Sequence, residues 1–261
     1  MKKTDDVVGA LEKLSKTDKG ITIVLSREDK KFISYKELWN RSFYVSELFK
    51  KQGVSRNTEV IIRCENLELF LYSFWACAIG GYIAVPIDAS KNSNVDSLLA
   101  HVLEKSVQPI IVSDSEQDKD KGRVLYLQDF YTEILKCPNN LNVEYQTSPE
   151  DILYILYSSG TTGTPKGVMI SKSNVAANVY GFAKHYAIDE NDKFLSWTPL
   201  THCYGLVIFH LVPLMAGADQ CLLSTKLYMN QPLIWAETIN EYRATRIGSL
   251  PFALKHFNNV Y

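Results

Sequence analysis

The sequence predicts an α/β fold in which helices cover mostly parallel sheets. Short apolar runs of strand type alternate with longer segments of helical periodicity, and this alternation is typical of βαβ crossovers. Capping and terminating residues separate the two kinds of segment. The chain has 261 residues, of which 46% are hydrophobic, which is enough to bury the core of one large domain or two smaller ones.

The first half of the chain follows this alternation closely. Strands are expected at residues 21–25, 59–63, 82–86, 109–112 and, more weakly, 124–127, and helices at 34–52, 66–79 and 95–105. Ser34 and Glu37 form a capping-box pattern at the start of the first helix, and Gly53 ends it. The charged segment 113–123 predicts a surface loop.

A connector rich in Asn, Ser and Pro, residues 138–149, separates the two halves. It predicts one α/β subdomain over residues 1–145 and a second over 146–261. In the second, strands are expected at 152–157, 168–171, 194–197, 220–223 and 246–250, and helices at 173–186, 206–215 and 233–242. The chain stops as another helix begins, so we expect the second subdomain to be truncated at its C-terminus.

Charge and cysteine content exclude several classes of protein. The net charge of -1 gives no basis for a nucleic-acid partner. The five cysteines contain no C-x-x-C pair, so they predict reduced thiols in a cytoplasmic protein and no metal site. The N-terminus has no apolar stretch of the kind found in signal peptides, and no apolar run is long enough for a membrane span.

One segment carries chemistry, and it follows the expected strand at residues 152–157 directly. It reads Tyr-Ser-Ser-Gly-Thr-Thr-Gly-Thr-Pro-Lys-Gly from Tyr157 to Gly167. Such a run exposes backbone N–H groups and hydroxyls with little side-chain bulk, which is what a polyphosphate needs, and Lys166 adds a mobile positive charge.

The segment is not a Walker A loop, which places Gly before the lysine and Ser or Thr after it. Pro165 and Gly167 stand in those places. Two other interpretations stay open at this point: a flexible Gly/Ser/Thr linker and an anion-binding loop without catalysis.

Residues 158–167 resemble the [ST]-[ST]-G-T-T-G-x-P-K-G signature of the adenylate-forming, AMP-binding enzymes without a departure. This family includes acyl- and aryl-CoA synthetases, fatty acyl-AMP ligases and peptide-synthetase adenylation domains. Segments 78–88, 196–206 and 244–251 are also similar to family motifs, so the resemblance runs from about residue 20 to the C-terminus. It implies the layered N-terminal domain of such an enzyme, without the later motifs for adenine, ribose, metal and the catalytic lysine.

The resemblance implies that ATP activates a carboxylic acid as an acyl-adenylate, with release of pyrophosphate and transfer to a thiol of CoA or a carrier protein. Mg²⁺ would assist. It assigns nucleotide binding to Ser158, Ser159, Gly160, Thr161, Thr162, Gly163, Thr164 and Lys166. It assigns catalytic roles to Lys166, Thr161 and His202 and names no metal-ligating residue. Without the later motifs, residues 1–261 alone are expected to be inactive.

The segment His202-Cys203-Tyr204-Gly205 has no acidic residue, whereas amino-acid-activating members use an Asp in this region for the substrate amine. An unpaired ammonium in a closed site is costly, so a fatty or aryl acid is expected. His202 could instead be a capping or core residue, while Trp197, Tyr204, His185 and His210 are interpreted as structural. The alternative function is a non-catalytic homologue that acts as a binding or assembly module.

Overall fold

The computed structural model describes residues 6–90, 92–138, 145–158 and 165–260. Its contacts divide the chain into two compact units. We call Met1–Lys36 with Val175–Tyr261 the terminal unit, and Glu37–Asn174 the central unit. Both have helices packed on a mostly parallel sheet, which confirms the predicted α/β class.

The sheet of the terminal unit has the order β11-β9-β10-β1-β2. Its strands are β1 (Gly20–Val24), β2 (Lys30–Ser34), β9 (Lys193–Ser196), β10 (Asp219–Leu223) and β11 (Arg246–Ile247). All neighbours pair in parallel except β1 and β2, which form an antiparallel hairpin. The parallel pairing of β1 with β10 joins Ile21 to Gln220 and Val24 to Leu223, so residues from both ends of the chain share one sheet.

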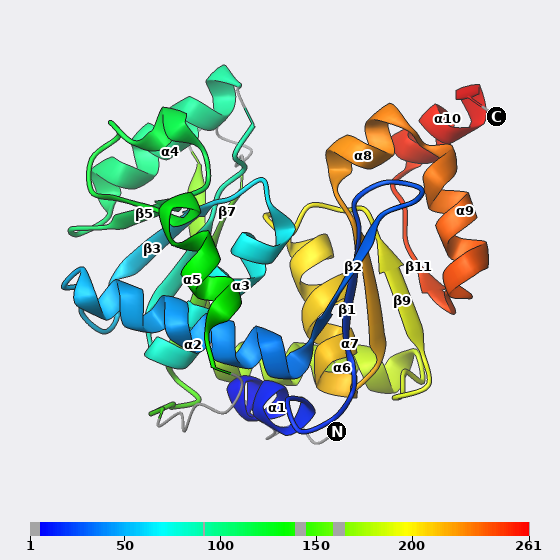
Figure 1. Cartoon of the computed structure of the whole chain (residues 1–261), viewed down its shortest axis with the longest axis horizontal. Helices are drawn as coiled ribbons and strands as arrows, with labels where there is room; N and C mark the ends of the chain where they lie inside the picture. The colour runs from blue at the N-terminus through cyan, green and yellow to red at the C-terminus, as the bar shows by residue number, and fades with distance from the viewer. Residues whose placement is uncertain (1–5, 91, 139–144, 159–164, 261) are drawn as a thin grey trace. The chain divides into compact units, whose positions relative to one another are not determined.

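Helices cover both faces of this sheet. They are α1 (Val7–Leu14), α6 (Lys172–His185), the π-helix η3 (Tyr204–Leu211), α7 (Val212–Ala216), α8 (Thr225–Asn230), α9 (Leu233–Tyr242) and α10 (Pro251–Val260). Figure 1 shows α8, α9 and α10 on one face and α6 and α7 on the other. On the first face Trp197 stacks on Tyr228 with ring centroids 4.3 Å apart, and Trp235 packs into the same cluster.

The sheet of the central unit has the order β6-β5-β3-β4-β7-β8. Its strands are β3 (Glu59–Arg63), β4 (Ile83–Pro86), β5 (Ile110–Ser113), β6 (Val124–Tyr126), β7 (Ile152–Ser158) and β8 (Lys166–Ser171). Its helices are α2 (Tyr35–Lys51), α3 (Leu67–Gly80), α4 (Ser93–Lys105) and α5 (Tyr131–Lys136), with the short 3-10 turns η1 (Glu116–Asp118) and η2 (Leu127–Phe130). Only β8 runs antiparallel to its neighbour.

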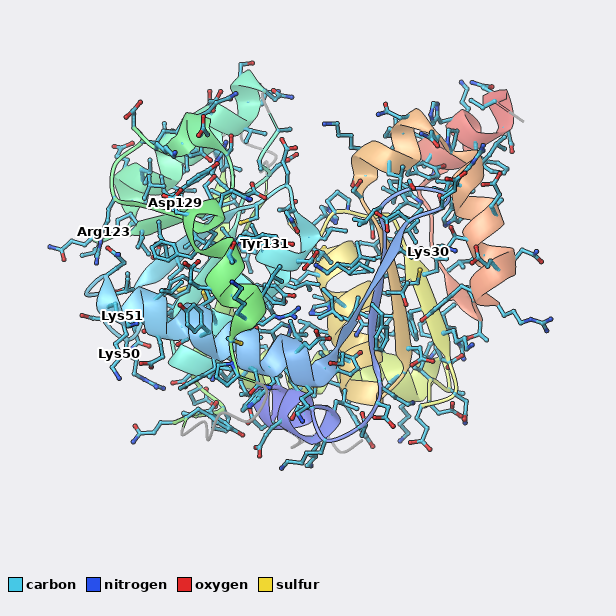
Figure 2. All side chains as sticks on the ribbon, in the orientation of Figure 1. Lys30, Lys50, Lys51, Arg123, Asp129 and Tyr131 are labelled. Atoms are coloured by element: carbon cyan, nitrogen blue, oxygen red, sulfur yellow. The ribbon has the colours of Figure 1, made fainter. Side chains whose placement is uncertain are left out.

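Helix boundaries follow the capping residues. The Asn66 side chain accepts hydrogen bonds from the N–H groups of Glu68 and Leu69 and so starts α3, which ends at Gly81 in the left-handed conformation. In the last turn of α2, Lys50 and Lys51 are exposed and point outward (Figure 2). Positive charge at this position stabilises the C-terminus of a helix. No helix in the described part of the chain combines the length and apolar character needed to cross a membrane.

Several elements differ from the sequence prediction. Helices α1, α5 and α8 and strand β2 were not anticipated, because each is short or too polar to produce a clear period. The helix expected at residues 206–215 is η3 followed by α7, and the strand expected at 246–250 is only β11, since α10 begins at Pro251. The boundary expected between residues 145 and 146 falls inside the central unit, because β7 pairs with β4 and extends its sheet.

The segment 113–123, predicted as a surface loop, contains a buried charge. Asp118 is 1% exposed, and its Oδ2 accepts hydrogen bonds from Arg63 Nε at 3.0 Å and Ser113 Oγ at 2.7 Å. Burial alone would raise the Asp118 pKa, but these hydrogen bonds and the Arg63 charge outweigh it, so the pKa lies below its usual value. The prediction of a surface loop was therefore wrong at Asp118.

A chain of buried hydrogen bonds crosses the core of the terminal unit. The His210 ring on η3 lies 2.9 Å from Gln220 Oε1 on β10, and Gln220 Nε2 donates to the Tyr35 hydroxyl at 2.6 Å. All three side chains are fully buried. Burial lowers the pKa of His210 to about 4 despite the hydrogen bond with Gln220, so the ring is neutral at neutral pH.

We predict that His210 makes the stability depend on pH. The unfolded histidine titrates near 6.5 and the folded one near 4, so between these values the unfolded chain binds more protons. The free energy of unfolding should fall as pH drops through this window, by about 3 kcal/mol in total from this group. Urea unfolding of the wild type and His210→Gln at pH 7, 5.5 and 4 measures it. Exposed His185→Gln is the matched control, and equal slopes for wild type and His210→Gln would contradict the prediction.

Candidate functional site

The predicted phosphate loop is the connection of the β7–β8 hairpin. Ser158, the last residue of β7, pairs with Lys166, the first residue of β8. Residues 159–164 lie outside the described residues, so the candidates Ser159, Gly160, Thr161, Thr162, Gly163 and Thr164 are not placed. The ends of the loop are nevertheless fixed, because β7 is paired on both sides, with β4 and β8.

Lys166 presents its charge at the edge of the central unit's sheet. Its side chain is exposed, and no hydrogen bond or ion pair to another described residue engages it. The next position, Gly167, faces Tyr157, whose ring would lie 3.0 Å from an added Cβ. The ammonium of Lys166 is therefore available to an anion at the loop, while the strand behind it is held by cross-strand packing.

The strand-to-helix junction after β8 is anchored by reciprocal hydrogen bonds. The Ser171 N–H donates to Asn174 Oδ1, and the Asn174 N–H donates to Ser171 Oγ, both at 3.2 Å. Buried Lys172 donates to Thr147 Oγ1 at 2.5 Å and lies 3.5 Å from Asp151 Oδ2. These contacts fix the C-terminal end of β8.

Asp151 links this junction to the rest of the central unit. Its carboxylate accepts a hydrogen bond from Arg56 Nη2 at 2.7 Å and one from the Ser148 N–H at 2.9 Å. Partial burial would raise the Asp151 pKa, but the Ser148 hydrogen bond and the charges of Lys172 and Arg56 outweigh it, so the pKa lies below its usual value.

His202 lies in the terminal unit, in the turn between β9 and η3. Its side chain is exposed, so it is not a core residue. The Tyr204 N–H donates to His202 Nδ1 at 3.2 Å, so the neutral ring carries its proton on Nε2. That N–H has no partner among the described residues and can donate to a ligand. The turn is tight, because a Cβ at Gly205 would overlap the Pro199 carbonyl.

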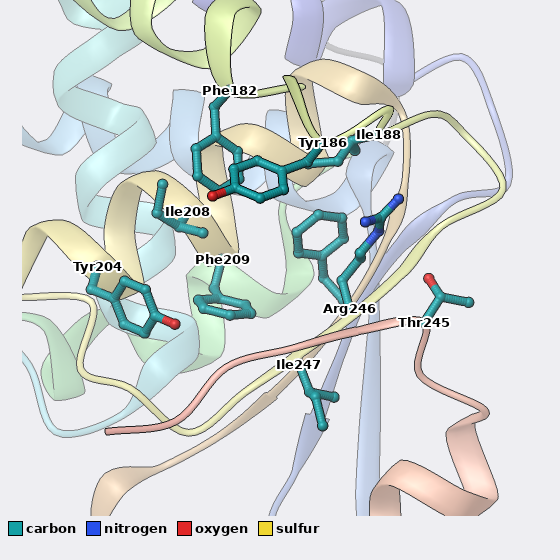
Figure 3. Close-up of a pocket in the computed structure, with 10 residues that line it drawn as sticks. Phe182, Tyr186, Ile188, Tyr204, Ile208, Phe209, Thr245, Arg246 and Ile247 are labelled. Carbon is teal, nitrogen blue, oxygen red and sulfur yellow. The ribbon is translucent and has the colours of Figure 1, made fainter. Parts of the chain in front are cut away.

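Beside this turn lies a cavity of about 460 Å³, which we call the aromatic pocket. It is lined by Phe182, Tyr186, Ile188, Phe194, Tyr204, Ile208, Phe209, Thr245, Arg246 and Ile247. Figure 3 shows the rings of Phe182 and Tyr186 together on one side, with Tyr204 and Phe209 on another and Ile247 on the β11 segment. The volume falls within the range of small-molecule sites, and the lining is mainly apolar.

The sequence did not single out the residues that line this pocket, and Tyr204 was interpreted as structural. The available signal was the pair Phe182 and Tyr186, four residues apart on α6, whose ring centroids lie 4.5 Å apart. Periodicity could not show that this face of the helix meets the β9–β11 edge. Trp197, by contrast, is buried in the core as expected.

One end of the aromatic pocket is polar. Arg246 Nε donates to Asp192 Oδ1 at 2.9 Å, and Thr245 Oγ1 donates to the same oxygen at 2.6 Å. Burial would raise the Asp192 pKa, but these hydrogen bonds outweigh it and the pKa lies below its usual value. The guanidinium is therefore neutralised locally, and the pocket offers no strong site for a second charge.

The described residues contain no group of three or more His, Cys, Asp or Glu side chains arranged to hold a metal ion. Magnesium commonly binds through one or two carboxylates together with substrate phosphates. A magnesium ion held in this way would need no such group of side chains.

The chain belongs to the AMP-binding enzyme family, whose model matches residues 12–260. It is similar to the medium-chain-fatty-acid–[acyl-carrier-protein] ligase JamA of Moorena producens, with 26% identity over 86% of this chain and 40% of that ligase. It is also similar to the long-chain-fatty-acid–AMP ligase FadD26 of Mycobacterium tuberculosis, with 25% identity over 79% of this chain and 37% of that protein. The chain thus spans less than half the length of these relatives.

A solved structure gives the same fold. The adenylation domain of a keto acid-selecting NRPS module, bound to a keto acyl adenylate, superposes with a TM-score of 0.88. The match covers 98% of this chain and 49% of that chain at 24% identity.

We predict that Asp151→Asn destabilises the central unit, because it removes the counter-charge of buried Lys172. The free energy of unfolding should fall by about 1–3 kcal/mol at pH 7. Since the folded pKa of Asp151 is depressed, its contribution is present above about pH 4 and disappears as pH falls through the folded pKa. Urea unfolding at pH 7 and pH 3 checks both parts. A loss of the same size at both pH values would show that charge is not the cause.

Proposed function

We propose that the intact natural polypeptide activates a fatty or aryl carboxylic acid with ATP, giving an acyl-adenylate and pyrophosphate. The acyl group would then pass to the thiol of CoA or of a carrier protein. The observation that carries the proposal is the Gly/Ser/Thr-rich connection of the β7–β8 hairpin. It ends at Lys166, whose exposed side chain has no partner among the described residues. Because the chain spans less than half the length of these relatives, we expect that residues 1–261 alone do not catalyse this reaction.

In this mechanism the loop holds the triphosphate. Backbone N–H groups and hydroxyls from Ser158 to Thr164 would surround the phosphates, with Thr161 and Lys166 nearest the reacting group. Mg²⁺ would neutralise charge on the phosphates. A carboxylate oxygen attacks the α-phosphorus while the bond to pyrophosphate breaks, and no general base is needed because the acid is already ionised at neutral pH.

His202 would stabilise charge in the transition state. Its Nδ1 accepts the Tyr204 N–H, so Nε2–H is the group that can donate to a carboxylate or phosphate oxygen. The hydrogen bond from Tyr204 fixes the ring orientation without consuming this donor. An adjacent aromatic pocket would then receive the substrate's tail.

The acid is proposed to be apolar and without an α-amine. No carboxylate lines the aromatic pocket, and residues 202–205 contain none, so an ammonium would lack a partner. The names of JamA and FadD26 refer to fatty acids, which supports the same class. A cytoplasmic location and the absence of a nucleic-acid partner stay predictions from composition.

The test is pyrophosphate release by the intact natural polypeptide with ATP, Mg²⁺ and single acids. Octanoate, dodecanoate and benzoate should each give acid-dependent release, and the twenty amino acids should give less. A response to amino acids alone would contradict the proposed substrate. If none of the acids gave pyrophosphate release while ATP binding persisted, the result would favour the alternative of a non-catalytic binding or assembly module.

We predict that Lys166→Ala lowers kcat/KM for acid-dependent pyrophosphate release by about a hundredfold, because a charge near the transferring phosphate is lost. Stability should change by no more than about 0.5 kcal/mol, since the side chain is exposed. Lys184→Ala, an exposed change on α6, is the matched control and should keep full activity. A large drop in melting temperature for Lys166→Ala would show a structural role instead.

A further inference from the structure

The helix η3, which follows the turn with His202, has a π-helical register. At its start the Leu206 N–H donates to the His202 carbonyl, four residues back, at 2.9 Å. At its end the Val212 N–H donates to the Val207 carbonyl, five residues back. The helix therefore accommodates one residue more than an α-helical path would need. Such a register is rare and often occurs at functional sites, so contacts with the rest of the fold must hold it.

Two buried contacts hold the ends of η3. Near its start, Gly205 lies so close to the Pro199 carbonyl that an added Cβ would overlap it. Near its end, the His210 ring lies 2.9 Å from Gln220 Oε1 on β10, and both of these side chains are fully buried. Because both contacts belong to the same helix, a slip of η3 along its axis would break at least one of them.

The Gln220 side chain is itself fixed in one orientation. Its Nε2 donates to the Tyr35 hydroxyl at 2.6 Å, and that hydroxyl donates to the Ala218 carbonyl at 3.5 Å. Since Nε2 is used in this way, Oε1 is the atom that faces His210 and accepts a hydrogen bond from Nδ1–H. The contact between η3 and β10 is therefore directional, and it fits one tautomer of His210.

The His202 ring depends on the first turn of η3. The His202 carbonyl accepts the Leu206 N–H at 2.9 Å, and His202 Nδ1 accepts the Tyr204 N–H at 3.2 Å. A slip of one residue turns a helix by about 100° and advances it by about 1.5 Å. Such a slip would carry the Tyr204 donor away from Nδ1, and the His202 ring would lose its fixed orientation.

We propose that His210 and Gln220 form a positioning pair, which holds η3 in its π register and so orients His202 for the adenylation. The proposal rests on the proposed function, because it deepens the account of the same site. A misplacement of about 1 Å can lower a rate about a hundredfold. Loss of the pair should therefore lower kcat, whereas KM for ATP should change little because the phosphate loop belongs to the central unit.

The test is the double variant His210→Leu/Gln220→Leu in the intact natural polypeptide. It replaces both polar groups by apolar ones of similar size, so neither member of the pair is left buried without its partner. We expect kcat for octanoate-dependent pyrophosphate release to fall by about tenfold or more, with KM for ATP within about twofold of the wild type. His210→Asn can still donate to Gln220 and should keep most of the wild-type kcat.

A second readout does not need turnover. In the 261-residue chain, ¹H–¹⁵N spectra of the histidine rings at pH 8 show which nitrogen of His202 carries the proton. The wild type and His210→Asn should carry it on Nε2, and the double variant should show a mixture of both tautomers. The matched control is Thr238→Val, which removes another buried hydrogen-bonded group of the terminal unit, on α9. It should change neither readout.

Circular dichroism shows whether each variant folds, and His210→Leu/Gln220→Met replaces the double variant if that variant does not. An unchanged kcat, or an unchanged His202 tautomer, in a folded double variant would overturn the proposal. If the intact wild type releases no pyrophosphate with any acid, the proposed adenylation is refuted instead, and the His202 tautomer alone then decides whether the pair orients the ring.

Discussion

The parallel pairing of β1 with β10 is the contact on which the terminal unit depends. It places residues 21–24 beside residues 220–223, so strands nearly two hundred positions apart share one ladder. Without this pairing, β10 would be an edge strand, and the β1–β2 hairpin would have no sheet to extend. The buried chain from His210 through Gln220 to Tyr35 runs beside this pairing and ties η3 and the start of α2 to β10. Non-local pairing of this kind is costly in chain entropy and must be offset by burial.

The same sheet places the candidate acid site. Because β9, β10 and β11 are parallel, the segments that leave their carboxyl ends meet at one edge of the sheet, where binding residues of parallel sheets commonly gather. The turn with His202 follows β9, and Gly248 follows β11. In the central unit the phosphate loop instead connects two antiparallel strands, β7 and β8. The inner strand, β7, pairs with a neighbour on each side. The strands that enter and leave the glycine-rich connection are therefore both held in the sheet.

The sequence was sufficient for the fold class and for most strands, since β3 and α9 occur at the predicted residues and Asn66 caps α3 as expected. It was also sufficient for the family, because residues 158–167 form a long and specific motif. It could not reveal β2, whose Lys30 and Lys31 obscure the alternation of an edge strand. Nor could it reveal buried Asp118, because a charged segment gives no sign that Arg63, 55 residues away, supplies the partner. The lining of the aromatic pocket was not evident for a similar reason: it comes from segments 182–188, 194–209 and 245–247, which only the fold brings together.

The central claim is that a carboxylate oxygen attacks the α-phosphorus of ATP at this site. The most direct measurement uses octanoate labelled with ¹⁸O in its carboxylate, incubated with ATP, Mg²⁺ and the intact natural polypeptide, followed by mass spectrometry of the nucleotides. The account predicts octanoyl-AMP, and AMP carrying one ¹⁸O after its hydrolysis at the acyl carbon. Formation of ADP, or of AMP without the label, would contradict it, because the oxygen that attacks the α-phosphorus must remain on that phosphate.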